Sequence, residues 1–203
     1  CRNCQEKISV KYPIFEFLTG LLFMYAYFRL GFSWELVPAL LLISLIVIIT
    51  VSDIEYLIIE DKIIFVFLVL ILILRIFIRL PDNFVTFGIN PYLESLIGGV
   101  FGFSVLYLVA FLGKLLLKKD VMGGGDIKLY AVVGLMLGLK MTILSLFLAS
   151  VAGSVIGMFL IFVNVIKKGN PLPFGPFIGL GSLLSYFFGN QIIGWYLNLF
   201  LRG

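Results

Sequence analysis

The chain has 203 residues, of which 62% are apolar and only 13% charged, with a net charge of +4; soluble domains are nearer half apolar and a quarter charged. This composition indicates a membrane protein, in which basic residues mainly set orientation rather than bind nucleic acid. The absence of histidine excludes Ser-His and Cys-His catalysis and His-ligated zinc hydrolysis, which leaves carboxylates, Lys, Tyr or Cys for acid–base chemistry.

Long apolar stretches predict an all-α fold, a polytopic integral membrane helical bundle with about six to seven transmembrane helices surrounded by the lipid bilayer. We expect residues 1–12 to be the remnant of a cytoplasmic cysteine-containing segment, and residues 13–203 to form one membrane-embedded domain. In chain order, the predicted helices cover residues 13–31, 35–52, 63–80, 92–117, 127–139, 141–164 and 177–201.

The first polar segment contains Cys1-x-x-Cys4, the spacing of half a zinc site or of a redox pair. Two thiolates cannot close a tetrahedral zinc site, so they are either half of a larger site or two ordinary free thiols. Because the chain begins at Cys1 rather than Met, we expect it to be a fragment or a processed product.

Four carboxylates lie within nine residues between the second and third predicted helices: Asp53, Glu55, Glu60 and Asp61. A solvated loop accounts for most of them. Asp53 differs because it directly follows an apolar helix, so it is expected where the helix meets water.

A second carboxylate, Asp126, follows a run of glycines in the segment Met122–Lys128. An ionisable group at the edge of the hydrocarbon is costly and therefore a functional-site candidate. We expect the glycine run to be flexible and to let backbone approach a substrate held as an extended strand.

The sequence does not decide how two later apolar stretches cross the bilayer. Residues 127–139 are too few to cross comfortably, so either this is a short helix in a thinned or protein-lined region, or Asp126 and Lys128 already lie below the membrane surface. Residues 177–201 are interrupted at Gly189-Asn190 and form either one span or a span followed by a surface helix.

Small residues predict close helix packing in two other helices: Gly98, Gly99 and Gly102, then Gly153 and Gly157.

The distribution of basic residues predicts the orientation. With residues 1–12 in the cytoplasm and alternating spans, ten of the 15 Lys and Arg residues fall on the cytoplasmic side and five on the other, as the positive-inside rule requires. Asp53 and Asp126 then lie on the same, cytoplasmic face.

Two carboxylates at one face of a protein without histidine suggest an aspartic protease. Such a pair binds one proton between them, because two like charges a few ångströms apart cannot both ionise. The ionised member takes a proton from the attacking water, and the protonated member donates to the peptide carbonyl oxygen.

The motifs together resemble the type IV prepilin peptidase family (leader peptidases), which are membrane aspartic peptidases of the Gly-x-Gly-Asp type. The resemblance covers nearly the whole chain and rests on four motifs in order: Cys1-x-x-Cys4 with Ile8-Ser9, Tyr12-Pro13 and Glu16; Asp53 with Asp61; Gly123-x-Gly125-Asp126 with Lys128-Leu129; and Pro173-Phe174-Gly175-Pro176.

The resemblance implies that Asp53 and Asp126 are the catalytic pair, with supporting or substrate-binding roles for Gly123, Gly125, Lys128, Asp61, Glu55 and Glu60. The implied activity is an aspartic endopeptidase in the cytoplasmic (inner) membrane. It would cleave the short basic leader of type IV prepilins or pseudopilins at the cytoplasmic face, as in type IV pilus and type II secretion systems. The acidic Glu55, Glu60 and Asp61 could attract such a leader.

The resemblance also implies possible cofactors. Proteolysis needs none, but many family members methylate the new N-terminal amine with S-adenosylmethionine and carry a second Cys-x-x-Cys pair that would complete a four-cysteine zinc site with Cys1 and Cys4. That earlier pair is not in this sequence, and Glu60 stands where the family usually has proline.

Two alternatives from other classes remain. A small ion-coupled transporter could use Asp53 and Asp126 near broken helices, although transporters more often place charges at mid-membrane and show two related halves. An accessory membrane subunit, in which the aspartates merely end helices, is the third possibility.

Overall fold

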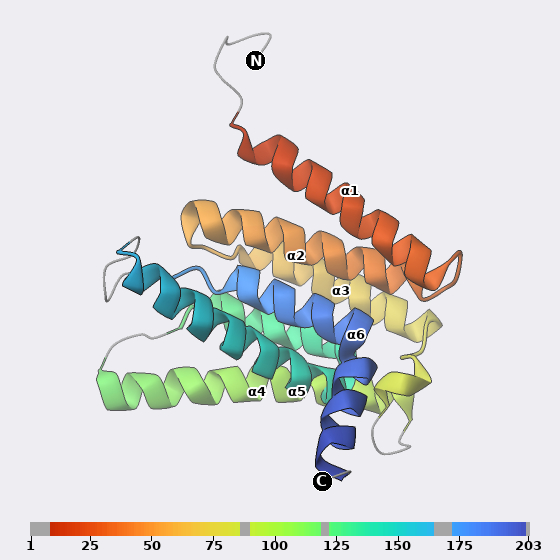
Figure 1. The fold of residues 1–203 in the computed structure, drawn as a ribbon. Helices are drawn as coiled ribbons and strands as arrows, with labels where there is room; N and C mark the ends of the chain where they lie inside the picture. Colours follow the sequence, from red (N-terminus) through yellow and green to blue (C-terminus); the bar gives the residue numbers. More distant parts are fainter. Residues whose placement is uncertain (1–8, 86–89, 119–121, 165–171, 202–203) are drawn as a thin grey trace.

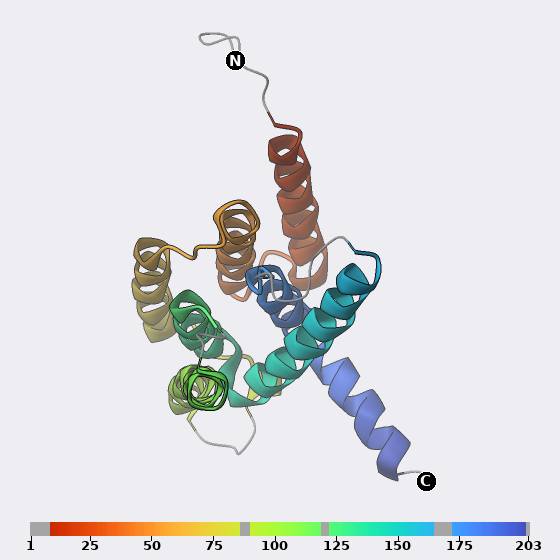
Figure 2. The same ribbon diagram turned by 90° about the vertical axis from the view of Figure 1, so that its left-hand side faces the viewer.

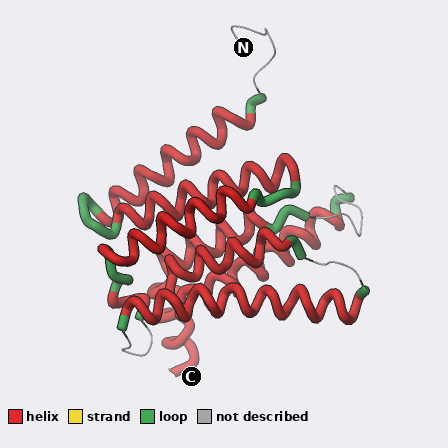
Figure 3. The backbone as a smooth tube through the Cα atoms, turned by 180° about the vertical axis from the view of Figure 1, so that it is seen from behind, coloured by secondary structure: helices red, strands yellow, loops and turns green. Residues whose placement is uncertain are grey.

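The computed structural model describes residues 9–85, 90–118, 122–164 and 172–201, and all regular structure in these ranges is helical (Figure 3). The predicted all-α fold is therefore confirmed. The helices are α1 Lys11–Leu30, α2 Leu36–Tyr56, α3 Asp61–Phe77, the short 3-10 helix η1 Asp82–Phe84, α4 Pro91–Leu117, α5 Gly124–Phe162 and α6 Gly175–Leu201.

Four of the described helices are long and apolar enough to cross a membrane: α2, α4, α5 and α6. Helix α3 has 17 residues, about 26 Å at 1.5 Å per residue, and runs alongside them. The predicted bundle of membrane helices is thus confirmed. The expected number of six to seven spans is approximate, since four of the described helices have the length and hydropathy of a span.

The helices α2 to α6 lie side by side, and α1 leans away from them with the N-terminus at its outer end (Figures 1 and 2). The tightest pairing joins α4 to the first half of α5. A Cβ on Gly98 would lie 2.5 Å from the carbonyl oxygen of Gly134, and one on Gly102 would lie 2.6 Å from that of Tyr130. The predicted packing role of these α4 glycines is confirmed.

Helix α5 is broken at Gly138, whose backbone has φ +70° and ψ 174°. The break separates the two predicted helices, 127–139 and 141–164, and the chain reverses there (Figure 2). The first half is short but wrapped by protein, since most of residues 126–138 are buried. The expected short helix lined by protein is therefore observed, and the depth of Asp126 and Lys128 relative to the membrane surface stays a prediction.

The break leaves carbonyl groups without helical partners, and two buried side chains satisfy them. Arg75 of α3 donates to the carbonyl oxygens of Leu135 (3.2 Å) and Met136 (2.6 Å). Ser95 of α4 also donates to Leu135. The guanidinium thus lies at the carboxyl end of a half-helix, where the helix dipole favours a positive charge.

Two predicted boundaries need correction. Helix α2 continues to Tyr56, so Asp53 lies within its last turn rather than beyond its end. The glycine run is also not a free loop, because Gly124 and Gly125 already form the first turn of α5 and Gly123 is its N-cap residue. The start of α6 contacts the α2 extension at Asp53, and Ile59 contacts the α5 extension at Gly125.

Helix α6 is continuous through Gly189-Asn190. These residues already lie at the end of the bundle opposite the start of α6, as two contacts show. The carbonyl of Phe187 accepts from Arg29 at the end of α1, and Asn190 accepts from Lys140 just after the α5 break. The last turns then point away from the bundle (Figure 1). The structure thus shows one continuous helix, of which Gly175–Leu199 is long and apolar enough for a single span.

Candidate active site

The structure brings Asp53 and Asp126 together at one end of the bundle. Asp53 lies in the last turn of α2 and Asp126 in the first turn of α5. Their exposed fractions are only 6% and 8%, and the two carboxylates are near enough to interact electrostatically. The prediction that they share one face is confirmed as geometry, and their catalytic role stays a prediction.

The Asp53 carboxylate is held by the beginning of α6. The backbone N–H of Gly175 donates to Asp53 Oδ2 at 2.7 Å, and the backbone of Phe174 lies beside the same carboxylate. A Cβ on Gly175 would lie 2.9 Å from Asp53 Oδ2. The motif Pro173–Pro176 was noted in the sequence without a role; its glycine lets the α6 backbone approach a carboxylate of α2.

The Asp126 carboxylate occupies the third position of α5, and it interacts with the backbone of the N-cap residue Gly123. This is one half of a capping box. Both aspartates thus lie at helix N-termini, Asp126 at its own and Asp53 at that of α6. The helix dipoles and free N–H groups there offset part of the cost of burying two carboxylates.

The segment 57–60 closes over the start of α5. Leu57 has φ +54°, and Ser52 donates to the Ile58 carbonyl at 2.7 Å. A Cβ on Gly125 would lie 2.7 Å from the Cβ of Ile59. Gly125 therefore permits close packing against Ile59, and its expected role of admitting an extended substrate stays a prediction.

Two ion pairs tie the elements around the site. Lys128 Nζ lies 2.7 Å from Asp61 Oδ2, joining α5 to the start of α3. Lys11 Nζ lies 3.6 Å from Glu55 Oε1, joining α1 to the end of α2. Glu60, the residue before α3, is exposed. Both lysines and all three acids therefore lie at the same end of the bundle as the aspartate pair.

Behind Asp126 lies a line of buried hydroxyl groups that the sequence reasoning missed. Tyr130, fully buried and one turn after Asp126, interacts electrostatically with it. Its hydroxyl lies 3.4 Å from Ser145 Oγ, which lies 3.1 Å from Ser182 Oγ. The i, i+4 spacing of Asp126 and Tyr130 was the available signal, but the two serines are far away in the chain.

Comparisons with known proteins agree with this arrangement of two paired carboxylates. A sequence model described as the type IV leader peptidase family matches residues 40–158, which include both aspartates. A second, the bacterial peptidase A24 N-terminal domain, matches residues 1–30. The chain belongs to the type IV leader peptidase family.

Several curated relatives of this leader peptidase family member bear the name prepilin leader peptidase/N-methyltransferase. The chain is 35% identical over 201 residues to the one from Bacillus subtilis, covering 99% of this chain and 75% of the relative. It is 34% identical over 202 residues to that of Aeromonas hydrophila, covering 99% of this chain and 66% of the relative. For Stutzerimonas stutzeri the identity is 33% over 199 residues, with 98% and 65% covered. No solved structure matches the chain significantly.

Family membership supports a membrane peptidase, and the transporter alternative is not supported by any of these matches. The predicted metal site receives no support either. In the part of the chain that the structure describes, no three His, Cys, Asp or Glu side chains gather to hold a metal ion. Cys1 and Cys4 lie outside the described residues, so their metal role stays a prediction. The domain division after residue 12 also remains untested.

Proposed function

We propose that this leader peptidase family member is an aspartic endopeptidase that removes the leader of type IV prepilins or pseudopilins, with Asp53 and Asp126 as its catalytic pair. One observation carries the proposal: two buried carboxylates from distant helices lie within electrostatic reach at one end of the bundle. A chain without histidine then offers this pair as its acid and base.

In this mechanism the two carboxylates hold one proton between them. The ionised aspartate takes a proton from water as the water oxygen bonds to the peptide carbonyl carbon, and the protonated aspartate gives its proton to the carbonyl oxygen. The tetrahedral intermediate then collapses: its C–N bond breaks, and the amine leaves with a proton returned through the pair. The Gly175 N–H, which donates to Asp53, would keep that carboxylate in place throughout.

The direct test uses the full chain in detergent and a prepilin-like peptide with a basic leader. Asp53→Asn and Asp126→Asn should each lower the cleavage rate by about 10²–10⁴-fold, the usual contribution of a general acid or base. Thermal unfolding and size-exclusion behaviour should match the wild type, because amide and carboxyl groups are nearly isosteric. Cleavage that persists in either folded variant would contradict the assignment.

We propose further that Glu60 and Asp61, with Glu55, attract the basic leader. Support comes from their position beside the aspartate pair and from lysine side chains already bound there: Lys11 at Glu55 and Lys128 at Asp61. A leader lysine could replace these internal lysines.

Glu60→Gln and Asp61→Asn should therefore raise KM for a basic leader by up to about fivefold each, the size of an exposed ion pair, with little change in kcat. The control is a peptide whose leader lysines are replaced by glutamine, for which KM should not change. An equal effect on both peptides would mean that the acids act on folding or on the site itself.

We propose a cytoplasmic orientation for this end of the bundle, in the inner membrane, supported by the bias of ten basic residues against five. A cysteine placed at exposed Lys62 should react with a membrane-impermeant reagent only when the cytoplasmic side is accessible. Reaction in intact cells would reverse the orientation.

The N-methyltransferase in the names of the relatives suggests S-adenosylmethionine as a methyl donor, and we propose that the new N-terminus is methylated after cleavage. S-adenosylmethionine would supply a methyl group to the freed amine. The proposal assigns neither this cofactor nor zinc to any described residue.

A further inference from the structure

A cavity of about 580 Å³ lies at the end of the bundle away from the aspartate pair. It is bounded by Trp34 and Glu35 before α2, and by Phe77 at the end of α3 with the residues 78–82 that follow it. Glu35 is the N-cap residue of α2 and Asp53 lies in its last turn, 18 residues later, which is about 27 Å along a helix. The cavity is therefore at the opposite membrane face and has no part in the proposed proteolysis.

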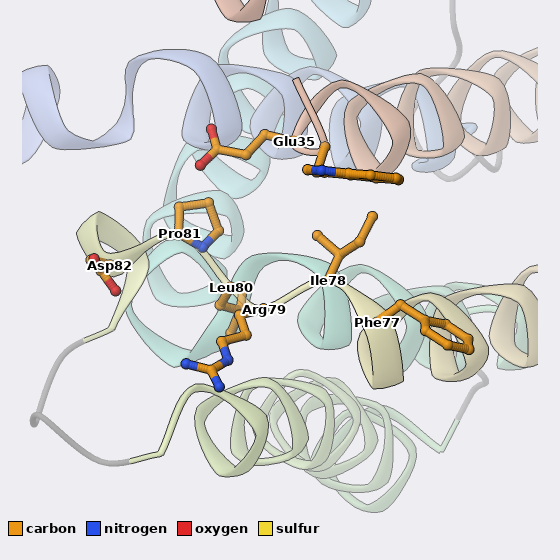
Figure 4. Close-up of a pocket in the computed structure, with 8 residues that line it drawn as sticks. Glu35, Phe77, Ile78, Arg79, Leu80, Pro81 and Asp82 are labelled. Carbon is orange, nitrogen blue, oxygen red and sulfur yellow. The ribbon is translucent and has the colours of Figure 1, made fainter. Parts of the chain in front are cut away.

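The lining of the cavity is divided by polarity (Figure 4). The carboxylates of Glu35 and Asp82 lie on one side together with Arg79, while Ile78 and Phe77 lie on the other, toward α3. Glu35 precedes the first turn of α2, Arg79 follows the end of α3 and Asp82 begins η1, whereas Phe77 is still within α3. The cavity thus has a charged end and an apolar end.

The charged groups of the lining are available to a ligand. Across residues 9–85, 90–118, 122–164 and 172–201, no hydrogen bond or ion pair occupies the side-chain charges of Glu35, Arg79 or Asp82. Phe77 and the neighbouring Trp34 are each 80% exposed, as aromatic residues at a membrane interface are. An amphiphile with a charged head and an apolar body would satisfy both ends.

The signs of the charges select the head group. The two carboxylates favour a cationic group in the ligand. The planar guanidinium of Arg79 can donate two parallel hydrogen bonds to a phosphate. A primary ammonium has three N–H donors for the Glu35 and Asp82 oxygens, whereas a trimethylammonium has none. An anionic lipid without an amine would leave both carboxylates facing negative charge.

We infer that this cavity binds a phospholipid with a phosphoethanolamine head group, its ammonium between Glu35 and Asp82 and its phosphate on Arg79. An adjoining cavity of about 220 Å³ shares Glu35 and Pro81 and is lined by Arg29 of α1 and Tyr186 of α6. A lipid bound here would thus contact the ends of α2 and α3 next to the place where α1 meets α6.

The test is native mass spectrometry of the full chain in detergent, with phosphatidylethanolamine, phosphatidylcholine and phosphatidylglycerol of identical acyl chains added separately. The wild type should bind phosphatidylethanolamine about tenfold more tightly than phosphatidylcholine, the effect of charge-assisted hydrogen bonds. Glu35→Gln should abolish most of this preference. Arg79→Gln should weaken both phosphatidylethanolamine and phosphatidylcholine by a similar factor.

The matched control is Lys62→Gln, an exposed charge at the other face, which should keep wild-type lipid selectivity. Thermal unfolding without added lipid checks that the cavity variants fold. Equal binding of the two zwitterionic lipids by the wild type, a preference for phosphatidylglycerol, or unchanged selectivity in folded Glu35→Gln would overturn the inference. Because none of these measurements involves cleavage, the outcome is independent of the proposed peptidase activity.

Discussion

At the scale of single residues, the candidate site depends on a backbone contact as much as on its two carboxylates. Asp53 comes from α2, but the N–H that holds it belongs to Gly175 at the start of α6. An amide donating to a carboxylate stabilises and orients it. The position of Asp53 relative to Asp126 is therefore set by how α6 begins, and not by α2 alone.

Gly175→Ala tests this dependence. The new Cβ would lie 2.9 Å from Asp53 Oδ2, so the carboxylate must shift and its hydrogen bond weakens. We expect kcat for the leader peptide to fall by about tenfold, equivalent to about 1.4 kcal/mol, with KM little changed.

Gly194→Ala in the same helix is the matched control, because a Cβ there has nothing within 4 Å. It should retain wild-type kcat. If both alanine variants lost activity equally, the cause would be helix α6 as a whole rather than the contact with Asp53.

At the scale of elements, the first half of α5 is the part that carries Asp126, and it ends abruptly at Gly138. Its terminal carbonyls are buried away from water, where an unpaired backbone group is costly. Arg75 provides donors to two of them and is itself only 6% exposed. The guanidinium thus keeps a short, buried half-helix stable.

Arg75→Met should lower the free energy of unfolding by about 1–3 kcal/mol, the cost of leaving a buried acceptor unsatisfied. The Met136 carbonyl loses its donor, whereas the Leu135 carbonyl keeps Ser95. Equilibrium unfolding in mixed detergent measures the change. Lys62→Met, in the exposed first turn of the same helix, should have little effect, and a similar loss in both variants would refute the capping role.

At the scale of the whole molecule, the bundle is held by close backbone contact between α4 and the first half of α5. Helices in a membrane gain little from hydrophobic burial against each other, so small residues and tight packing hold them together. Gly98 faces the backbone of Gly134 and Gly138, which brings α4 against the last turn before the break in α5 and against the break itself.

Gly98→Ala should therefore lower the thermal unfolding midpoint and reduce cleavage, because the Cβ would meet the Gly134 carbonyl oxygen at 2.5 Å and the helices must separate. Gly20→Ala in α1 is the control: its Cβ has nothing within 4 Å, and alanine is the better helix former. A fall of the midpoint in Gly20→Ala, or none in Gly98→Ala, would contradict this account of the packing.

Much of the helical layout could be predicted from local signals. The lengths of the apolar stretches predicted the helix boundaries to within a few residues. The bias of basic residues and the order of the spans predicted that Asp53 and Asp126 lie at the same end of the bundle. The boundaries failed where tertiary contacts extend helices. Asp53 lies inside α2, and two of the glycines before Asp126 form the first turn of α5, because packing against neighbouring helices overrides the weak helix propensity of glycine.

The sequence by itself determined the chemistry that is available: no histidine, two aspartates at helix ends, and apolar stretches long enough to require a membrane. Only the tertiary structure decided which groups surround those aspartates. Gly175 contacts Asp53, Ile59 packs on Gly125, and Arg75 supports the half-helix that carries Asp126, each from a segment distant in the chain. Contacts of this kind depend on how helices pack in three dimensions, and neither hydrophobic length nor local spacing carries that information.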